Sequence, residues 1–246
     1  MPDDLKLVVV HARLQVLELV RFPGFSVATL AFPALMFVLF GLPRAGAHPE
    51  ILLASYSAFA VLGVGFFQFG VSGAAERGTP WQAWLRTLPV RPCVRVAARI
   101  LAALVFTLAS VAVVVGVVLA TTSAALSAAA WGRLLVALVA GSLPFVVLGL
   151  AIAYWASPKS ALPVANVLYM LLAYAGGLWT GPGDLPHAVR SLSPYTPTRQ
   201  WGDVLWPAVT GAPWPASHWL LLAAYAVGFG VLAAWGIARE ELQRFR

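Results

Sequence analysis

Residues 73–99 carry the side chains whose types and spacing point most clearly to a specific task. Thr79 is a residue type that caps helix N-termini, and Pro80 suits the first helical position, where its missing N–H costs nothing. Apolar residues then recur at i, i+3, i+4 and i+7 until Pro89, which ends the helix. These residues are Trp81, Trp84, Leu85 and Leu88. The pattern predicts a short amphipathic helix that either docks onto a protein or lies among lipid headgroups.

Catalytic and phosphate-binding signatures are missing from the sequence. A P-loop needs a glycine-rich turn that ends in Lys-Ser or Lys-Thr, but Lys159-Ser160 directly follows a proline. The sequence has no plausible GxSxG motif and no HExxH motif. Cys93 is the one cysteine, which excludes an intrachain disulfide and a cysteine-based zinc site. We therefore expect no enzyme activity, cofactor or metal site in this chain.

Six apolar runs make up most of the sequence, which is 61% hydrophobic and only 10% charged. A soluble domain of this length would need far more charge to cover its surface. Each run is close to the ~20 residues that cross a bilayer core. The runs are 22–42, 51–73, 100–121, 134–156, 161–181 and 217–238. The sequence predicts an all-α polytopic membrane protein with six transmembrane helices in a single domain, 1–246.

Lys and Arg are distributed unevenly between the segments that join these runs. With the N-terminus inside, twelve of the sixteen fall on the inner side. The four outer residues are Arg44, Arg133, Arg190 and Arg199. The positive-inside rule therefore predicts that both termini are cytoplasmic. The net charge of +7 then reflects membrane topology, and we expect no nucleic-acid partner.

The six runs contain no Asp, Glu, Lys or Arg. Proton-coupled transporters and pumps usually keep an ionisable side chain within the membrane. If this protein moves a substrate, the work must therefore be supplied from outside its spans.

The N-terminal segment 1–21 is a candidate amphipathic helix. Its apolar side holds Leu5, Val8, Val9, Ala12, Val16 and Leu19. Lys6 and Arg13 share another face, as expected for a helix that lies on an anionic inner leaflet. Arg91, Arg95 and Arg99 follow at spacings of four where the third run begins, and headgroup snorkelling explains them. Gripping an anionic lipid is the alternative for these three.

The second and fifth runs each carry several polar and aromatic residues together with glycines. Gly177 and Gly181 have the spacing of a GxxxG packing motif, which is also common by chance in glycine-rich spans. The residues that attract attention are Tyr56, Phe59, Gln68, Asn166, Tyr169, Met170, Ala173 and Gly177. Residues 166–170, 173 and 177 fall on one helical face, which borders a cavity or simply packs against other helices. Pro144 is expected to kink the fourth span.

The segment 182–216 has seven prolines among several tryptophans. Such a density of proline breaks long helices and leaves short pieces. Because Trp201, Trp206 and Trp214 need apolar contacts, we expect the pieces to be half-embedded at the outer interface. A solvated linker is the alternative.

The run Glu76-Arg77-Gly78-Thr79, the aromatic helix and Leu88-Pro89-Val90 together resemble the first cytoplasmic loop of ABC type-2 transporter permeases. The resemblance implies that 74–96 is a coupling loop whose short helix docks onto a separate ABC ATPase subunit. ATP and Mg would bind to that partner. The chain differs from the family in carrying Trp81 and Trp84 where members often have acidic residues. The implied docking residues are Glu76, Arg77, Gly78, Thr79, Trp81, Trp84, Leu85, Arg86 and Leu88.

The resemblance extends over nearly the whole chain. It implies that 1–21 is an elbow helix and that 182–216 forms short re-entrant helices with an outer gate at Pro194, Tyr195 and Trp201. It also implies that the second and fifth spans line a homodimer interface and a translocation path. The protein would then export an unidentified substrate across a bacterial inner membrane.

Two other functions remain open at this point. One is a membrane scaffold or facilitator outside the ABC class, whose loop helix rests among lipids. The other is a secondary transporter, which the charge-free spans disfavour.

Overall fold

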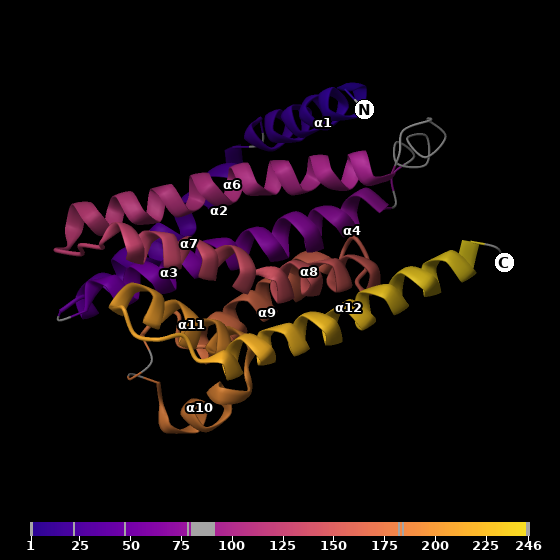
Figure 1. Ribbon diagram of the computed structural model, residues 1–246. Coiled ribbons are helices and arrows are strands. Elements are labelled where there is room, and N and C mark those ends of the chain that lie inside the picture. The colour runs from indigo at the N-terminus through magenta and orange to yellow at the C-terminus, as the bar shows by residue number, and fades with distance from the viewer. Residues whose placement is uncertain are drawn as a thin grey trace.

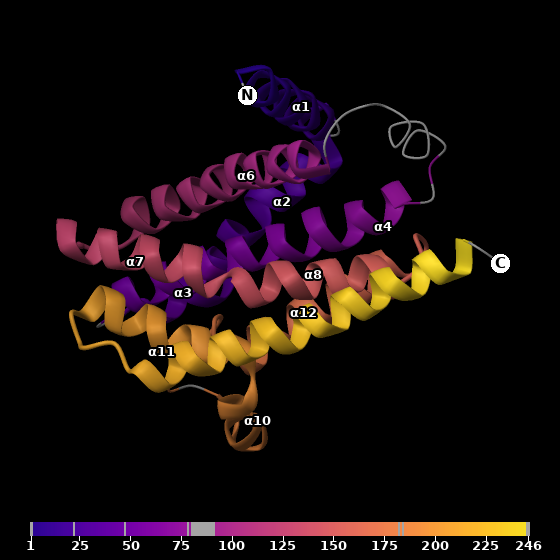
Figure 2. The ribbon, with the colours of Figure 1, turned by 45° about the vertical axis from the view of Figure 1, so that its right-hand side comes forward.

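A computed structural model describes residues 2–21, 23–46, 48–77, 79, 92–181, 183 and 185–244. These residues form helices and turns with no strand among them, as the sequence predicts. Apart from α1, the longer helices lie side by side along one axis, and the short helix α10 stands away from the bundle (Figures 1 and 2).

The chain begins with α1 (Pro2–Val20), α2 (Pro23–Met36), η1 (Phe37–Gly41), η2 (Leu42–Arg44), α3 (Pro49–Val64), η3 (Gly65–Val71), α4 (Ser72–Arg77) and α6 (Pro92–Thr121). It continues with α7 (Ala128–Gly141), α8 (Leu143–Trp155), α9 (Ala161–Ala175), α10 (His187–Leu192), η4 (Ser193–Tyr195), α11 (Pro197–Thr210) and α12 (Ala216–Arg244). The elements η1 and η3 are π-helical turns, whereas η2 and η4 are 3-10 turns.

The core of the bundle is built around α3. The span that begins in this helix is 78% buried, against 28% for the α6 span and 17% for the α12 span. The outward side chains of α6 and α12 are nevertheless apolar, for example Leu108 and Val227. An apolar exterior around a buried helix suits a bundle that is surrounded by lipid.

Among the described residues, four helices are long and apolar enough to cross a membrane, whereas the sequence predicts six spans over the whole chain. The four helices are Pro49–Arg77, Val96–Thr121, Ala128–Trp155 and Ala216–Glu240. The first and fifth predicted spans correspond to the shorter apolar helices Thr29–Arg44 and Ala161–Ala175. The fifth is short because the chain leaves the helix at Gly176 and turns at Gly177, whose φ is +75°. Fifteen residues rise only about 22 Å, less than a hydrocarbon core of about 30 Å.

The GxxxG interpretation of Gly177 and Gly181 is wrong. Both glycines lie beyond the end of α9 and have positive φ values, so they form a turn and not a helix-packing surface. The interpretation failed because spacing alone does not reveal where a helix ends. The sequence also predicts that Pro144 kinks the fourth span. The helix is interrupted two residues earlier, at Ser142 between α7 and α8.

The backbones of η3 and α8 approach each other very closely. A Cβ atom added at Gly149 would overlap the carbonyl oxygen of Gly65, and one at Gly70 would lie 3.3 Å from the carbonyl oxygen of Gly149. Small residues permit such backbone approach. The π-helical turn therefore sits where the two spans are in closest contact, and π-turns are frequent at functional sites.

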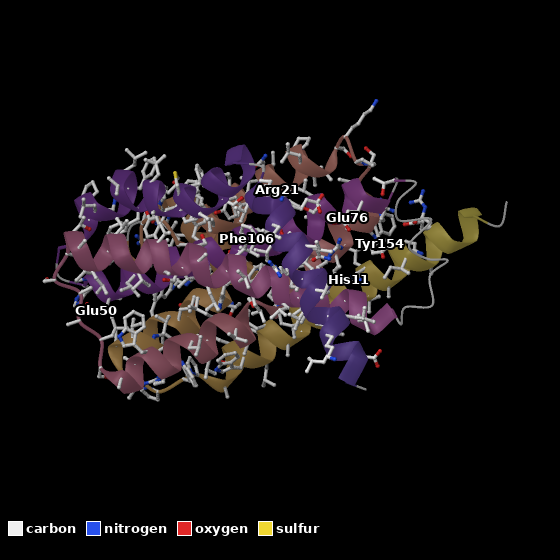
Figure 3. The ribbon with its side chains drawn as sticks, turned by 90° about the horizontal axis from the view of Figure 1, so that it is seen from above. His11, Arg21, Glu50, Glu76, Phe106 and Tyr154 are labelled. Atoms are coloured by element: carbon white, nitrogen blue, oxygen red, sulfur yellow. The ribbon has the colours of Figure 1, made fainter. Side chains whose placement is uncertain are left out.

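Helix α1 runs across the long axis of the bundle, as Figure 3 shows by the positions of His11 and Arg21. It packs against α6, and its apolar residues do not share one environment. Ala12 is buried and Val16 packs against the core, whereas Leu5 and Val9 are exposed. The predicted apolar stripe is therefore divided between the bundle and the exterior.

Candidate functional site

Arg77, the last residue of α4, joins three helices at the point where the chain enters the segment 78–91. Its Nη1 lies 2.5 Å from Oε2 of Glu240 in α12. Its Nη2 donates a 3.0 Å hydrogen bond to the carbonyl oxygen of Ala156, at the end of α8. The guanidinium also lies 5.2 Å from the ring centroid of Tyr154. We call Arg77, Tyr154, Ala156 and Glu240 the Arg77 cluster.

Glu76 forms an ion pair with Arg99 of α6, where the chain returns from the same segment. Figure 3 shows Glu76 and Tyr154 toward the same end of the bundle. The spacing of Arg91, Arg95 and Arg99 did not reveal that the Arg99 guanidinium has a carboxylate partner inside the chain. Two consecutive residues of α4 therefore connect it to α6 on one side and to α8 and α12 on the other.

Helix α12 is fixed to α8 beside the Arg77 cluster. The indole N–H of Trp155 donates a 2.9 Å hydrogen bond to the carbonyl oxygen of Leu232. Arg239 places its guanidinium 5.4 Å from the Trp155 ring centroid. A Cβ atom at Gly236 would lie 2.9 Å from Cβ of Tyr154, so glycine permits the close contact. These contacts make α8 and α12 one packed unit at this end.

Three of the predicted docking residues are described, and two have ion-pair partners within the chain. Glu76 and Arg77 hold the end of α4 as above, and the hydroxyl of Thr79 donates a 2.8 Å hydrogen bond to the Glu76 carbonyl oxygen. The other predicted docking residues lie outside the described residues. They are Gly78, Trp81, Trp84, Leu85, Arg86 and Leu88.

Three aromatic residues predicted on the second and fifth spans come together in the core. Phe59 and Tyr169 stack with centroids 4.5 Å apart and rings only 5° from parallel. The Tyr169 hydroxyl donates to the Phe59 carbonyl oxygen at 3.2 Å, and the Tyr56 hydroxyl to that of Trp179 at 2.9 Å. All three predicted side chains are buried within one chain. They join α3 to α9 and are not available for contact with a second copy.

The remaining predicted residues of these spans have different environments. Gln68 and Ala173 are buried, Met170 is partly buried and Asn166 is exposed. Gly177 lies in the turn after α9. The proposed common face is thus divided, with Asn166 on the exterior and Ala173 in the core. Asn166 is the member of the set whose side chain is free to face another molecule.

The three predicted gate residues are not equivalent. Trp201 is completely buried, and its indole N–H donates a 2.8 Å hydrogen bond to the Ala137 carbonyl oxygen. A Cβ atom at Gly141 would overlap its ring, so the indole fills the break between α7 and α8. Pro194 is exposed, as is Tyr195, whose carbonyl oxygen accepts a 2.5 Å hydrogen bond from Tyr225. Helix α11 thus lies inside the bundle, whereas η4 lies on its surface.

A polar group on α11 and α12 was not predicted. Arg199 pairs with Asp203 at 3.0 Å, one helical turn away, and its guanidinium lies 5.0 Å from the Trp206 ring. Nδ1 of His218 lies 2.5 Å from Oε1 of Gln200, which connects α12 to α11. Arg199 and Asp203 are four residues apart, but they stand in a proline-rich stretch where the sequence did not predict a continuous helix such as α11.

Glu240 and Tyr154 were also missed. Glu240 stands at the end of the last predicted span, with several arginines nearby in the sequence. Because a partly buried carboxylate needs a cationic partner, its position could have indicated an ion pair. The 163 residues between Arg77 and Glu240 prevented the pairing from being read along the chain.

Comparison with known proteins identifies the family of this chain. Residues 7–203 match the family described as ABC-2 type transporter. The chain is also 26% identical over 189 residues to YvfS of Bacillus subtilis (strain 168), a protein named as a candidate transport permease, with 77% of each chain covered. No solved structure matches the chain. Because the family match spans most of its length, this chain belongs to the ABC-2 type transporter family.

Proposed function

We propose that this protein is the membrane-spanning subunit of an ATP-driven exporter and that a separate ABC ATPase subunit supplies the energy. ATP and Mg would bind to that partner. The permease would work as a homodimer in a bacterial inner membrane, with six spans and both termini in the cytoplasm. The chemical class of the exported substrate is left open.

The proposal rests on the ion pairs that hold α4, the helix that leads into the segment 78–91. They join α4 to α6, which follows the segment, and to α12. Glu76 pairs with Arg99, and Arg77 pairs with Glu240. A loop that only rested among lipids would not need its entry helix tied to α6, α8 and α12. A docking loop does need this, because displacement of the loop must reach the spans.

The rest of the fold suits the same role. On docking, the helix predicted at 79–88 would transmit the ATPase movement to α4, and from there to the packed pair α8 and α12. The crossing of Gly65 and Gly149 is a suitable pivot, since backbones meet there directly. The exposed side chains of Asn166 and Val167 on α9 would face the second copy.

The proposal is tested by reconstitution. The permease should be co-expressed with an ABC ATPase encoded beside it, and both should be purified and placed in lipid vesicles. We expect no ATP hydrolysis by the permease alone and robust hydrolysis by the complex. Hydrolysis by a permease preparation free of other subunits would contradict the proposal, as would failure of the ATPase to bind.

Topology gives a second check on the same proposal. Single cysteines would be introduced at Ala212 and Gln243 in a background that lacks Cys93. Ala212 should label in intact cells, and Gln243 only after lysis. The reverse labelling would place the segment 78–91 away from ATP and would refute docking.

A further inference from the structure

We propose that Glu240 is a positioning residue through which movement of the segment 78–91 reaches the last span, α12. The inference rests on the proposed function, because it assumes that an ATPase moves this segment. It adds a residue that lies 163 positions from its partner Arg77 and outside the predicted docking loop.

The geometry gives Glu240 this role. Arg77 is the terminal residue of α4, so any displacement of the segment that follows acts first on its backbone. The Arg77 guanidinium contacts α8 through a neutral carbonyl oxygen and an aromatic ring. It contacts α12 through the carboxylate of Glu240 at 2.5 Å. Among the described residues, the charged contact therefore connects α4 directly to the last span.

Burial makes this contact hard to replace. The Arg77 and Glu240 side chains are 20% and 18% exposed. Nε of Arg77 is buried and has no hydrogen-bond partner among the described residues. The neighbouring carboxylate of Glu76 is already engaged by Arg99. Without Glu240, the partners of this poorly hydrated cation among the described residues would be a carbonyl group and a ring, and the guanidinium would turn toward water.

Loss of the contact would not separate α12 from α8. The Trp155 hydrogen bond to Leu232 and the close fit at Gly236 would persist. Removing the Glu240 carboxylate therefore removes the ion pair between α4 and α12 while these contacts between α8 and α12 stay. The inference predicts a protein that assembles and hydrolyses ATP but moves its last span poorly.

The experiment measures that movement directly. Spin labels would be attached to cysteines at Ala97 in α6 and Ala238 in α12, both exposed positions, in a background that lacks Cys93. The complex with the ATPase would be studied in lipid vesicles, without nucleotide and after trapping with ATP and vanadate. We expect a shift in the distance between the labels in the otherwise unchanged protein.

Glu240→Gln should reduce this shift at least twofold while partner binding and the KM for ATP stay within twofold of the unchanged protein. Arg77→Glu combined with Glu240→Arg should restore most of the shift, because the pair is re-formed with reversed charges. Arg239→Gln is the matched control: it removes a neighbouring charge that contacts α8, and it should keep the full shift.

The possible failures can be told apart. If no ATPase binds to the unchanged permease, the proposed function fails and this inference fails with it. If the ATPase binds and hydrolyses ATP but Glu240→Gln keeps the full shift, only the role of Glu240 is overturned. The same holds if the reversed pair restores nothing, or if the unchanged complex shows no shift.

Discussion

The two ends of the bundle are held together by different interactions. At the Arg77 end, charged side chains on α4 pair with charged residues of α6 and α12. At the Trp201 end, a buried indole fills the break between α7 and α8, and its N–H bonds to a backbone carbonyl. Packed aromatic contacts are lost steeply when surfaces separate, whereas ion pairs near water can exchange partners. If the protein works as proposed, we expect the Arg77 end to move and the Trp201 end to stay fixed.

The same contrast extends along the chain. Helix α11 is enclosed by α3, α7, α9 and α12, and its side chains are mostly buried. The Arg77 cluster keeps partial contact with solvent. Changes near Trp201 should therefore act mainly on stability, and changes near Arg77 mainly on transmission.

The largest effect on stability is expected from Trp201→Ala. The change deletes a fully buried indole and one 2.8 Å hydrogen bond, and it opens a cavity beside Gly141 and Phe145. Such truncations cost about 3–5 kcal/mol. The free energy of unfolding in detergent would be measured against Trp235→Ala, whose side chain is 64% exposed. Equal losses in the two variants would mean that α11 does not anchor its end.

A smaller loss of stability is expected from Gly149→Ala, at the crossing of η3 and α8 that lies between the two ends. The new methyl group would overlap the Gly65 carbonyl oxygen, and the backbone cannot move away as a flexible side chain would. Overpacking of this kind costs about 1–3 kcal/mol. Gly228→Ala is the control, because nothing lies within 4 Å of its added Cβ. The thermal unfolding temperatures of both variants would be measured. An unchanged temperature for Gly149→Ala would contradict the tight contact between η3 and α8.

Glu240→Gln should destabilise the purified permease only modestly, by about 1–2 kcal/mol, because a charge-assisted hydrogen bond at a half-buried site is lost. Denaturant unfolding of the permease without its partner gives this value. A loss as large as that of Trp201→Ala would indicate that the Arg77 end is a structural anchor too. The contrast between the two ends would then disappear.

The smallest effect is expected from Asp203→Asn. This change breaks an i,i+4 ion pair with Arg199 in which both side chains are 22% exposed. Pairs with this helical spacing contribute about 0.3–0.5 kcal/mol. The unfolding midpoint should therefore hardly change. A loss above that of Glu240→Gln would show that charge pairs matter equally at both ends.

The sequence predicted the all-helical class and the interruption near Pro144 because both follow from local patterns. Apolar runs reveal helices, and proline reveals a break. The end of α9 was not predictable, since the turn at Gly177 depends on a single positive φ value inside an apolar run. Length alone therefore made the fifth span look longer than its helix.

Contacts between distant residues could not be derived from spacing. Arg99 follows Arg91 and Arg95 at spacings of four, which suggested contact with lipid headgroups. Its ion-pair partner Glu76 lies 23 residues away in the sequence. Trp201 sits in a proline-rich stretch that suggested the surface, but it packs at the Gly141 break. The aromatic residues Phe59 and Tyr169 were singled out from their types, whereas their direct stacking required the folded chain.

The most direct test of the account concerns the helix predicted at 79–88. Trp81→Ala and Trp84→Ala would be combined in one permease that is co-expressed with the ATPase and purified in mild detergent. Buried aromatic anchors contribute about 2 kcal/mol or more to an interface, a factor of roughly 30 in affinity for each. We predict that the double variant inserts normally and that the ATPase no longer co-purifies, while Trp235→Ala retains it. Full retention of the ATPase by the double variant would contradict docking through this helix.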